Sequence, residues 1–420
     1  MDKPVIEGQG QQVVLDEAWS FIRKDWAVTL QATLEQRIEE CVRKFREYCR
    51  DIRQRQLQGQ KGSISYITYS MLRTSWLEQH PTYLVEATDE YWVLDTDPIQ
   101  FEWDVNWAFS YWSDLQQRHQ AEIMERGQSP LSKVGLERML LDAAAEFHAF
   151  MVNIIRLAMK RAVHTAEFQE LERGEIFEVR VGEYLDQSVS VYKEDRRKRD
   201  IQEVQAWLDL KDAHEYGYQA LTELDLSEGD YSRLDFRYTA FRGMQMEHSR
   251  LLFCVLVGTE WQDSHLQGTD FTSSLIHGAD FSGCSLRKAI LDRVMGSVND
   301  SDLWLEWEPL GFSAVDFTGA NLQGASFRLA ELQGAVFRNA TLQQASLIGA
   351  DLAAACFEDA DLTGASFAEA DLTDASFARA NLTDVSFAGA RLAGADFSDA
   401  KLQGVSLTEE QLCEVRGKIT

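Results

Sequence analysis

The chain has 420 residues, of which 45% are hydrophobic, and its 68 Asp and Glu residues against 41 Lys and Arg residues give a formal net charge of −27. This length allows two or three domains with separate cores. The acidic balance disfavours direct binding to nucleic acid or to an anionic membrane. It favours either simple solubility or a protein partner with a basic groove.

The sequence contains no targeting or membrane-spanning pattern. The segment from Met1 to Gln12 is polar, and no run approaches the roughly 18 apolar residues of a membrane span, so we expect a cytoplasmic protein. The six cysteines include no CxxC pair, which disfavours a disulfide framework and a zinc site. Cys41 and Cys49 are eight residues apart on a predicted helix, and a functional thiol pair is an alternative there.

Residues 1–220 are predicted to form an α+β, mostly helical domain, and we recognise no known family in it. The expected elements are a helix over Val13–Gln58, a strand-containing segment over Ser63–Thr88, a helix over Val134–Leu171, a hairpin of Glu175–Val181 with Ser188–Tyr192, and a helix over Asp200–Leu221 that leads into the C-terminal half.

An unusual stretch in this domain runs from Asp89 to Asp114. It holds four tryptophans and seven carboxylates but no Lys or Arg. Aromatic rings beside carboxylates can form a cleft for a cationic peptide or amine, which makes Trp103 and Trp107 candidate partner-binding residues. The alternative is that the aromatic side chains form the core of the domain and the acids its solvated edge.

Catalytic motifs are not evident in the sequence. The eight histidines form no HxH, HExxH or ExxH spacing, and nothing resembles a nucleophile elbow or a dinucleotide fingerprint. We therefore predict no catalytic residue, cofactor or metal. An enzyme that acts on a peptide or amine is kept as an alternative, and it predicts a pocket with convergent polar groups near Trp103 and Trp107.

A repeat begins in the irregular segment 221–292. Large apolar residues recur every five positions from Tyr231 to Leu291, and a small residue stands two positions before many of them. Cys254 and Cys284 occupy this small position, so we expect them to be interior residues and not reactive thiols.

The repeat loses its frame in the segment 293–311. Trp304 and Trp307 lie there beside Glu306 and Glu308. A loop that leaves a solenoid often carries specificity, so these four residues are candidates for partner binding. The alternative is that both tryptophans fold back to cover the coil.

From Phe312 to Leu407 the five-residue spacing has no gap. Neither a helix nor a strand has this period. A square coil with one pentapeptide per side accounts for it, and a second period of twenty between like residues, as from Phe317 to Phe337 to Phe357, predicts that equivalent side chains stack coil over coil.

The unit Ala350-Asp351-Leu352-Ala353-Ala354 resembles the pentapeptide-repeat family. The resemblance extends from Tyr231 to Leu407 and implies a right-handed quadrilateral β-helix, or pentapeptide-repeat solenoid, after the α+β domain. Residues 408–420 are expected to form a cap, with a short helix over Thr408–Leu412 that protects the last β edge. For function the resemblance is weak, because the family serves many purposes.

The residue before each apolar centre is expected to point outward. Glu331, Asp351 and Asp371 would form an acidic ladder that ends at Arg391. Some members of the family resemble duplex DNA and bind DNA gyrase. Residues 231–407 hold 23 acidic and 12 basic residues, a net charge of −11 (12 − 23). Over roughly 40 Å this is about half the linear charge density of DNA.

These observations predict a non-catalytic protein-binding or scaffold protein that presents a solenoid surface. The first alternative is a DNA-mimicking protein that binds a topoisomerase and gives resistance to a topoisomerase poison, as the resemblance implies. The partner is expected to be a protein, with no direct contact to nucleic acid or membrane, and a homodimer is left open.

Overall fold

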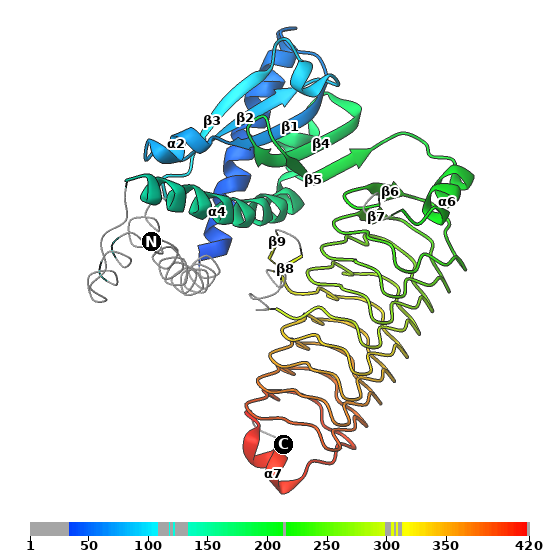
Figure 1. Ribbon diagram of the computed structural model, residues 1–420. Helices are drawn as coiled ribbons and strands as arrows, with labels where there is room; N and C mark the ends of the chain where they lie inside the picture. The colour runs from blue at the N-terminus through cyan, green and yellow to red at the C-terminus, as the bar shows by residue number, and fades with distance from the viewer. Residues whose placement is uncertain are drawn as a thin grey trace, which may run out of the picture. The chain divides into compact units, whose positions relative to one another are not determined.

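The computed structural model describes residues 33–107, 117, 121, 133–212, 216–298, 304–305, 308–309 and 313–417 (Figure 1). The chain divides into two compact units, Met1–Arg196 and Arg197–Thr420. This division lies 24 residues before the expected boundary at residue 220 (220 − 196 = 24). The reason is that the segment after Arg197 packs its apolar side chains into the core of the second unit.

The first unit is built on a five-stranded sheet with the order β3-β2-β1-β4-β5. Its strands are β1 (Ile64–Met71), β2 (Thr82–Thr88), β3 (Ile99–Asp104), β4 (Arg173–Glu183) and β5 (Ser188–Asp195). β1 and β4 are parallel, and the other neighbouring pairs are antiparallel. The predicted hairpin is confirmed, since β4 and β5 pair from Ile176–Asp195 to Gly182–Ser188.

The helices of the first unit are a helix over residues 33–57, α2 (Arg73–Leu77), the 3-10 helix η1 (Trp92–Leu94), α4 (Lys133–Ala162) and α5 (Ala166–Gln169). The first long helix is therefore confirmed over its described part. The prediction of a continuous helix to Leu171 is wrong at its end. Thr165 has extended backbone and donates its hydroxyl to the carbonyl of Ala162, so α4 ends there and only the short α5 follows.

Side-chain alternation gives the sheet one apolar and one polar face. The apolar face carries the buried residues Ile67, Tyr69 and Met71 of β1 beside Ala87, Val85 and Tyr83 of β2. It packs against the helices, as where Tyr48 of the helix 33–57 stacks on Phe101 of β3 with ring centroids 4.5 Å apart. The polar face lies on the other side of the same strands.

The second unit is a β-solenoid in which parallel bridges join residues twenty positions apart. Figure 1 shows the coils stacked one on another, and the bridges join equivalent residues of neighbouring coils into columns. One column passes through nine levels from Asp225 to Lys401. The predicted period of twenty is therefore the length of one coil.

A hydrogen-bonded turn closes most of the pentapeptides. The N–H of Ala320 donates to the carbonyl of Phe317 at 3.0 Å, and Gly319 between them has φ of +67°. The same position two residues after a centre is left-handed in unit after unit, including Ala354 (φ +57°) and Asp384 (φ +57°). A left-handed third residue is the mark of a type II turn, and its repetition fixes the five-residue period.

The interior confirms the stacking predicted from the sequence. The aromatic rings of Phe317, Phe337, Phe357 and Phe377 stack in one column with centroids 4.8–5.0 Å apart. In the irregular coils many of the small interior residues are polar, and their side chains donate to backbone carbonyls. The thiol of Cys254 donates to the carbonyl of Tyr231, and that of Cys284 to the carbonyl of Trp261. Burial raises the pKa of both thiols to about 12.

The solenoid begins earlier than Tyr231. The predicted helix from Asp200 to Leu221 is much shorter, since α6 (Ile201–Asp209) is followed by a left-handed Lys211. Leu221 lies instead in β6 (Ala220–Thr222), which pairs in parallel with β7 (Ala240–Arg242). The buried residues Tyr216, Leu221 and Leu226 extend the five-residue spacing backwards, and α6 packs on the first coil through Val204 and Leu208.

An insertion explains the loss of frame. The bridges Asp280–Asp316 and Met295–Glu331 join residues 36 positions apart, so one coil carries 16 extra residues (36 − 20). Because 16 is three pentapeptides plus one residue, the frame shifts by one. The centre before Phe317 is Gly296, where an added Cβ would lie 2.6 Å from Val315 Cγ2. Phe312, which we expected to be the first regular centre, lies outside the described residues.

The last coil ends as predicted. α7 (Glu409–Glu414) starts with a capping box in which the Thr408 side chain accepts from the N–H of Gln411 and the Gln411 side chain accepts from the N–H of Thr408. The amide Nε2 of the buried Gln411 donates to the carbonyls of Phe387 and Ala390 at 3.0 and 2.9 Å. α7 thus satisfies backbone groups of the coil that it covers.

Candidate functional site

The acidic ladder exists as one column of the solenoid. Glu331, Asp351, Asp371 and Arg391 are bridged in succession. Arg391 forms an ion pair with Asp371 at 2.8 Å, and Gln333 Nε2 donates to Asp351 Oδ2 at 2.6 Å. Glu331 is exposed. The column therefore has a net charge of −2 (three carboxylates and one guanidinium), concentrated at its Glu331 end.

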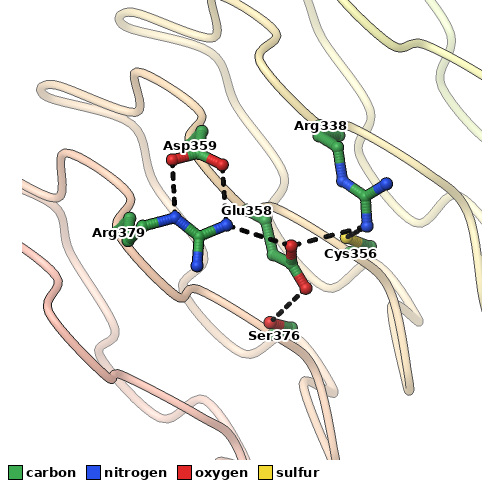
Figure 2. Close-up of polar contacts among 6 residues, drawn as sticks. All are labelled: Arg338, Cys356, Glu358, Asp359, Ser376 and Arg379. Atoms are coloured by element: carbon green, nitrogen blue, oxygen red, sulfur yellow. Dashed lines mark hydrogen bonds and ion pairs between the residues drawn. The ribbon is translucent and has the colours of Figure 1, made fainter.

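Other acids of the solenoid are neutralised across coils. Figure 2 shows Arg379 paired with both carboxylate oxygens of Asp359 at 2.8 Å, while its Nη2 also contacts Glu358 at 3.2 Å. Arg338 approaches Glu358 from the preceding coil at 3.4 Å. The hydrogen bonds from Arg379 hold the pKa of Asp359 below its ordinary value. Such exposed pairs add little stability but cancel the negative potential.

The insertion follows a segment that is hydrogen-bonded to Glu331, the first residue of the acidic column. The N–H of Gly296 donates to the carbonyl of Glu331 and that of Val298 to the carbonyl of Gln333, and the chain is back in register at Val315. Within the insertion, Trp304 belongs to β8 (Trp304–Leu305) and Glu308 to β9 (Glu308–Pro309), which pair antiparallel. The other two candidates of this loop, Glu306 and Trp307, lie outside the described residues.

Trp103 and Trp107 lie in the helix-covered core of the first unit. Trp103 is 3% exposed and packs edge-on against Tyr69 with ring centroids 5.8 Å apart. Trp107 lies against Phe147 of α4 at 5.2 Å, with the guanidinium of Arg37 4.0 Å from its ring. The structure does not bring these two rings together with Trp304 in one unit. Among the described residues, Trp103 also lies 6.2 Å from the ring of Tyr83, so both tryptophans contact other aromatic side chains of this unit.

A hollow of about 340 Å³ lies on the polar face of the sheet, where the sequence pattern predicts no site. Trp92 and Val93 of η1 line it together with residues of β1, β2 and the turn between β4 and β5. The residues that line it are Thr68, Ser70, Glu86, Thr88, Trp92, Val93, Asp95, Pro98, Glu183, Tyr184, Leu185, Asp186 and Ser188. The aromatic-acidic stretch is thus divided, with Trp103 in the core and Trp92 at the hollow.

The floor of the hollow is held by polar contacts. Trp92 Nε1 donates to Thr68 Oγ1 at 3.3 Å, and Lys61 forms an ion pair with Asp95 at 2.5 Å. Both side chains of that pair are buried, at 7% and 3% exposure. Burial opposes ionisation of Asp95, but Lys61 and backbone N–H groups hold its pKa below the ordinary value. Sequence spacing gives no signal for this cluster, because it joins a loop lysine to residues about thirty positions away.

No group of three or more His, Cys, Asp or Glu residues in the described part of the chain is arranged to hold a metal ion. His148 accepts or donates a hydrogen bond with the Tyr83 hydroxyl at 2.8 Å, and burial lowers its pKa to about 4. Cys41 and Cys49 are buried in the helix 33–57, and burial raises the pKa of both thiols. They are core residues of that helix.

Comparison with protein families agrees with the solenoid. The model described as a pentapeptide repeat region matches residues 340–416, and the model described as pentapeptide repeats in eight copies matches residues 253–293 and 312–347. The C-terminal region of the chain is thus a pentapeptide-repeat region, and the gap between the matches falls on the insertion. No family model matches the N-terminal unit.

Solved structures of pentapeptide-repeat proteins are similar to the chain at low identity. QnrB1, a plasmid-mediated fluoroquinolone resistance protein, is 17% identical, with a TM-score of 0.31, over 46% of this chain and 93% of its own. HetL from the cyanobacterium Nostoc sp. strain PCC 7120, involved in the regulation of heterocyst differentiation, is 21% identical, with a TM-score of 0.20, over 50% of this chain and 98% of its own. No curated protein matches the chain significantly.

Among the helices that the structure describes, none is long and apolar enough to cross a membrane.

Proposed function

We propose that this protein is a non-catalytic binding protein whose solenoid presents a surface to a protein partner. The observation that carries the proposal is the place of the insertion. The coil is interrupted after Val298, and the N–H of the nearby Gly296 donates to the carbonyl of Glu331, at the end of the acidic column that has no ion pair among the described residues. On this ground we propose that the candidate residues Trp304, Glu306, Trp307 and Glu308 act together with Glu331, Asp351 and Asp371. A basic, partly apolar partner surface fits this combination.

The finer features of the fold belong to the same proposal. Four columns of bridges per twenty-residue coil support a closed, four-sided coil, and the family resemblance implies that it is right-handed. A cytoplasmic location is proposed with it, because the six cysteines are scattered along the sequence.

Capture of partners from a lysate of the native organism, with the tagged whole chain, tests this function. In the test variant, Glu331→Gln, Asp351→Asn and Asp371→Asn remove three carboxylates from the column. In the control, Glu369→Gln, Asp384→Asn and Asp399→Asn remove three exposed carboxylates at left-handed turn positions on other sides. We expect a protein that the wild type and the control retain and the test variant loses about tenfold. Equal retention by both variants, or no specific protein, contradicts the proposal.

The alternative function, a DNA mimic directed at gyrase, derives from the family resemblance. Its charge requirement is poorly met, because Arg379, Arg338 and Arg391 divide the acidic surface into ion-paired segments. A supercoiling assay with purified gyrase, with and without a fluoroquinolone, separates the two functions. Protection at micromolar protein favours the mimic, and no effect at that concentration rejects it.

A further inference from the structure

We propose that the hollow on the polar face of the N-terminal sheet binds a lysine or arginine side chain of a partner protein. This site belongs to the first unit and is independent of the solenoid surface, so either proposal can fail without the other.

The charge of the hollow calls for a cation. Its lining holds four carboxylates, Glu86, Asp95, Glu183 and Asp186, and none of the described residues that line it is Lys or Arg. Lys61 pairs with Asp95, and Arg73 pairs with Glu183 at 2.6 Å, which leaves a local charge of −2 (−4 + 2). The neighbouring Arg180 and Lys193 share one carboxylate, Glu178, at 2.6 and 3.2 Å, so the hollow together with these three residues has a net charge of −1 (−5 + 4). Arg180 also donates to Ser188 of the lining and lies 5.0 Å from the Trp92 ring.

A buried hydroxyl gives a second, independent sign of a ligand. Thr88 is 5% exposed, and its Oγ1 has no hydrogen-bond partner among the described residues. Alternation along β2 places Thr88 on the same face as Glu86, so this hydroxyl belongs to the hollow. A buried polar group without a partner is destabilising, and an entering ammonium or guanidinium would satisfy it as a donor.

The residues around the hollow favour a ligand that is a side chain of a protein over one that is a free amine. Tyr91, Val93, Leu94, Tyr184 and Leu185 are 45–81% exposed on the two segments that flank the hollow. Trp92 (φ +52°) and Leu185 (φ +57°) hold strained left-handed backbone there. Such strain persists where the surroundings over-determine it, often at ligand sites. Exposed apolar side chains around an acidic hollow match a basic residue with apolar neighbours.

The hollow also has a suitable size. Its volume of about 340 Å³ lies at the lower end of the range for ligand sites, about 300–1,000 Å³. One long side chain fits this volume better than a folded segment or a large cofactor.

Fluorescence polarisation with labelled peptides tests the site in the whole chain. The probes are acetyl-Gly-Leu-X-Leu-Gly-amide peptides in which X is lysine, arginine, norleucine or glutamate, and the free diamine cadaverine serves as competitor. We expect the lysine or arginine peptide to bind at least tenfold more tightly than the norleucine peptide, with cadaverine a weak competitor. Equal binding of the lysine and norleucine peptides, or no binding of any peptide at 1 mM, overturns the proposal. Cadaverine that displaces the lysine peptide as effectively as the unlabelled lysine peptide does also overturns it, because the hollow then recognises a free amine.

Variants locate the binding. Thr88→Val keeps the shape of the side chain and removes the hydroxyl, and Asp186→Asn removes an exposed carboxylate in the β4–β5 turn. Each is expected to weaken the lysine peptide about three- to tenfold. Asp142→Asn, an exposed change of the same charge on α4, is the control and should leave affinity unchanged. If Thr88→Val fails to fold, Asp186→Asn decides, and a result equal to that of the control overturns the site.

Discussion

At the scale of single residues, the repeat is maintained by two positions with opposite demands. The centre must be large and apolar, as the buried Phe317 and Leu322 are, while the position two residues later must accept a left-handed backbone. Glycine meets that second demand at Gly319 and Gly324, but Ala354 holds the same conformation with a Cβ. A left-handed conformation costs a non-glycine residue about 1 kcal/mol or more. Pentapeptides with a non-glycine residue at this left-handed position are therefore less stable than the same units with glycine there would be.

Replacement of Ala354 by glycine should stabilise the solenoid. Ala354 is exposed, so the change removes steric strain at φ +57° without loss of packing, and we expect a gain of about 0.5–1 kcal/mol in the free energy of unfolding. Urea titration followed by circular dichroism measures it. Ala353→Gly, one residue earlier and without positive φ, is the matched control and should destabilise by a similar amount. A gain in both variants would show that strain at residue 354 is not the cause.

At the scale of elements, the sequence predicts what repeats and misses what depends on distant partners. The five-residue spacing predicted the coils and the Phe column, and the residues that follow the last repeat predicted the cap at Thr408. Each of these features depends on residues that are close in sequence or repeat regularly. The spacing placed the first apolar centre at Tyr231, later than the structure does, because Leu221 and Leu226 end or follow a segment that the sequence predicts to be a helix. The hollow was missed because Thr68, Thr88 and Asp186 come together only through strand pairing in the sheet.

The insertion gives an element-scale prediction. Removal of residues 299–314 joins Val298 to Val315 and restores the twenty-residue period, because the bridged residues are then 20 positions apart (36 − 16). We expect this variant to keep the circular dichroism spectrum of the wild type and a melting temperature within a few degrees of it. Removal of only residues 299–313 leaves one residue too many in the coil and should lower the melting temperature clearly. If the two deletion variants have the same melting temperature, residues 299–314 are not a simple addition to an ordinary twenty-residue coil.

At the scale of the whole molecule, a solenoid exposes unpaired backbone groups at each end, and such edges invite pairing with another chain. Here α6 covers the first coil through Val204 and Leu208, and α7 covers the last. The closure of the last coil depends strongly on Gln411, whose amide is buried and donates to the carbonyls of Phe387 and Ala390. Loss of this amide leaves the buried carbonyl of Ala390 without its donor, at a cost of about 1–3 kcal/mol, while the carbonyl of Phe387 still accepts from the N–H of Ala390.

Truncation at residue 407 should therefore convert the protein into self-associating species, whereas Gln411→Ala should only loosen the cap. We expect light scattering coupled to size-exclusion chromatography to show a concentration-dependent increase in mass for the truncated chain. For Gln411→Ala we expect an unchanged mass but faster hydrogen exchange at the backbone amides of residues 387–407, since the frayed end opens more often. Leu412→Ala, which alters an exposed residue of α7, is the control for both measurements. A truncated chain that keeps the mass of the full-length protein at all concentrations would mean that the last coil protects its own edge, and that α7 serves another purpose.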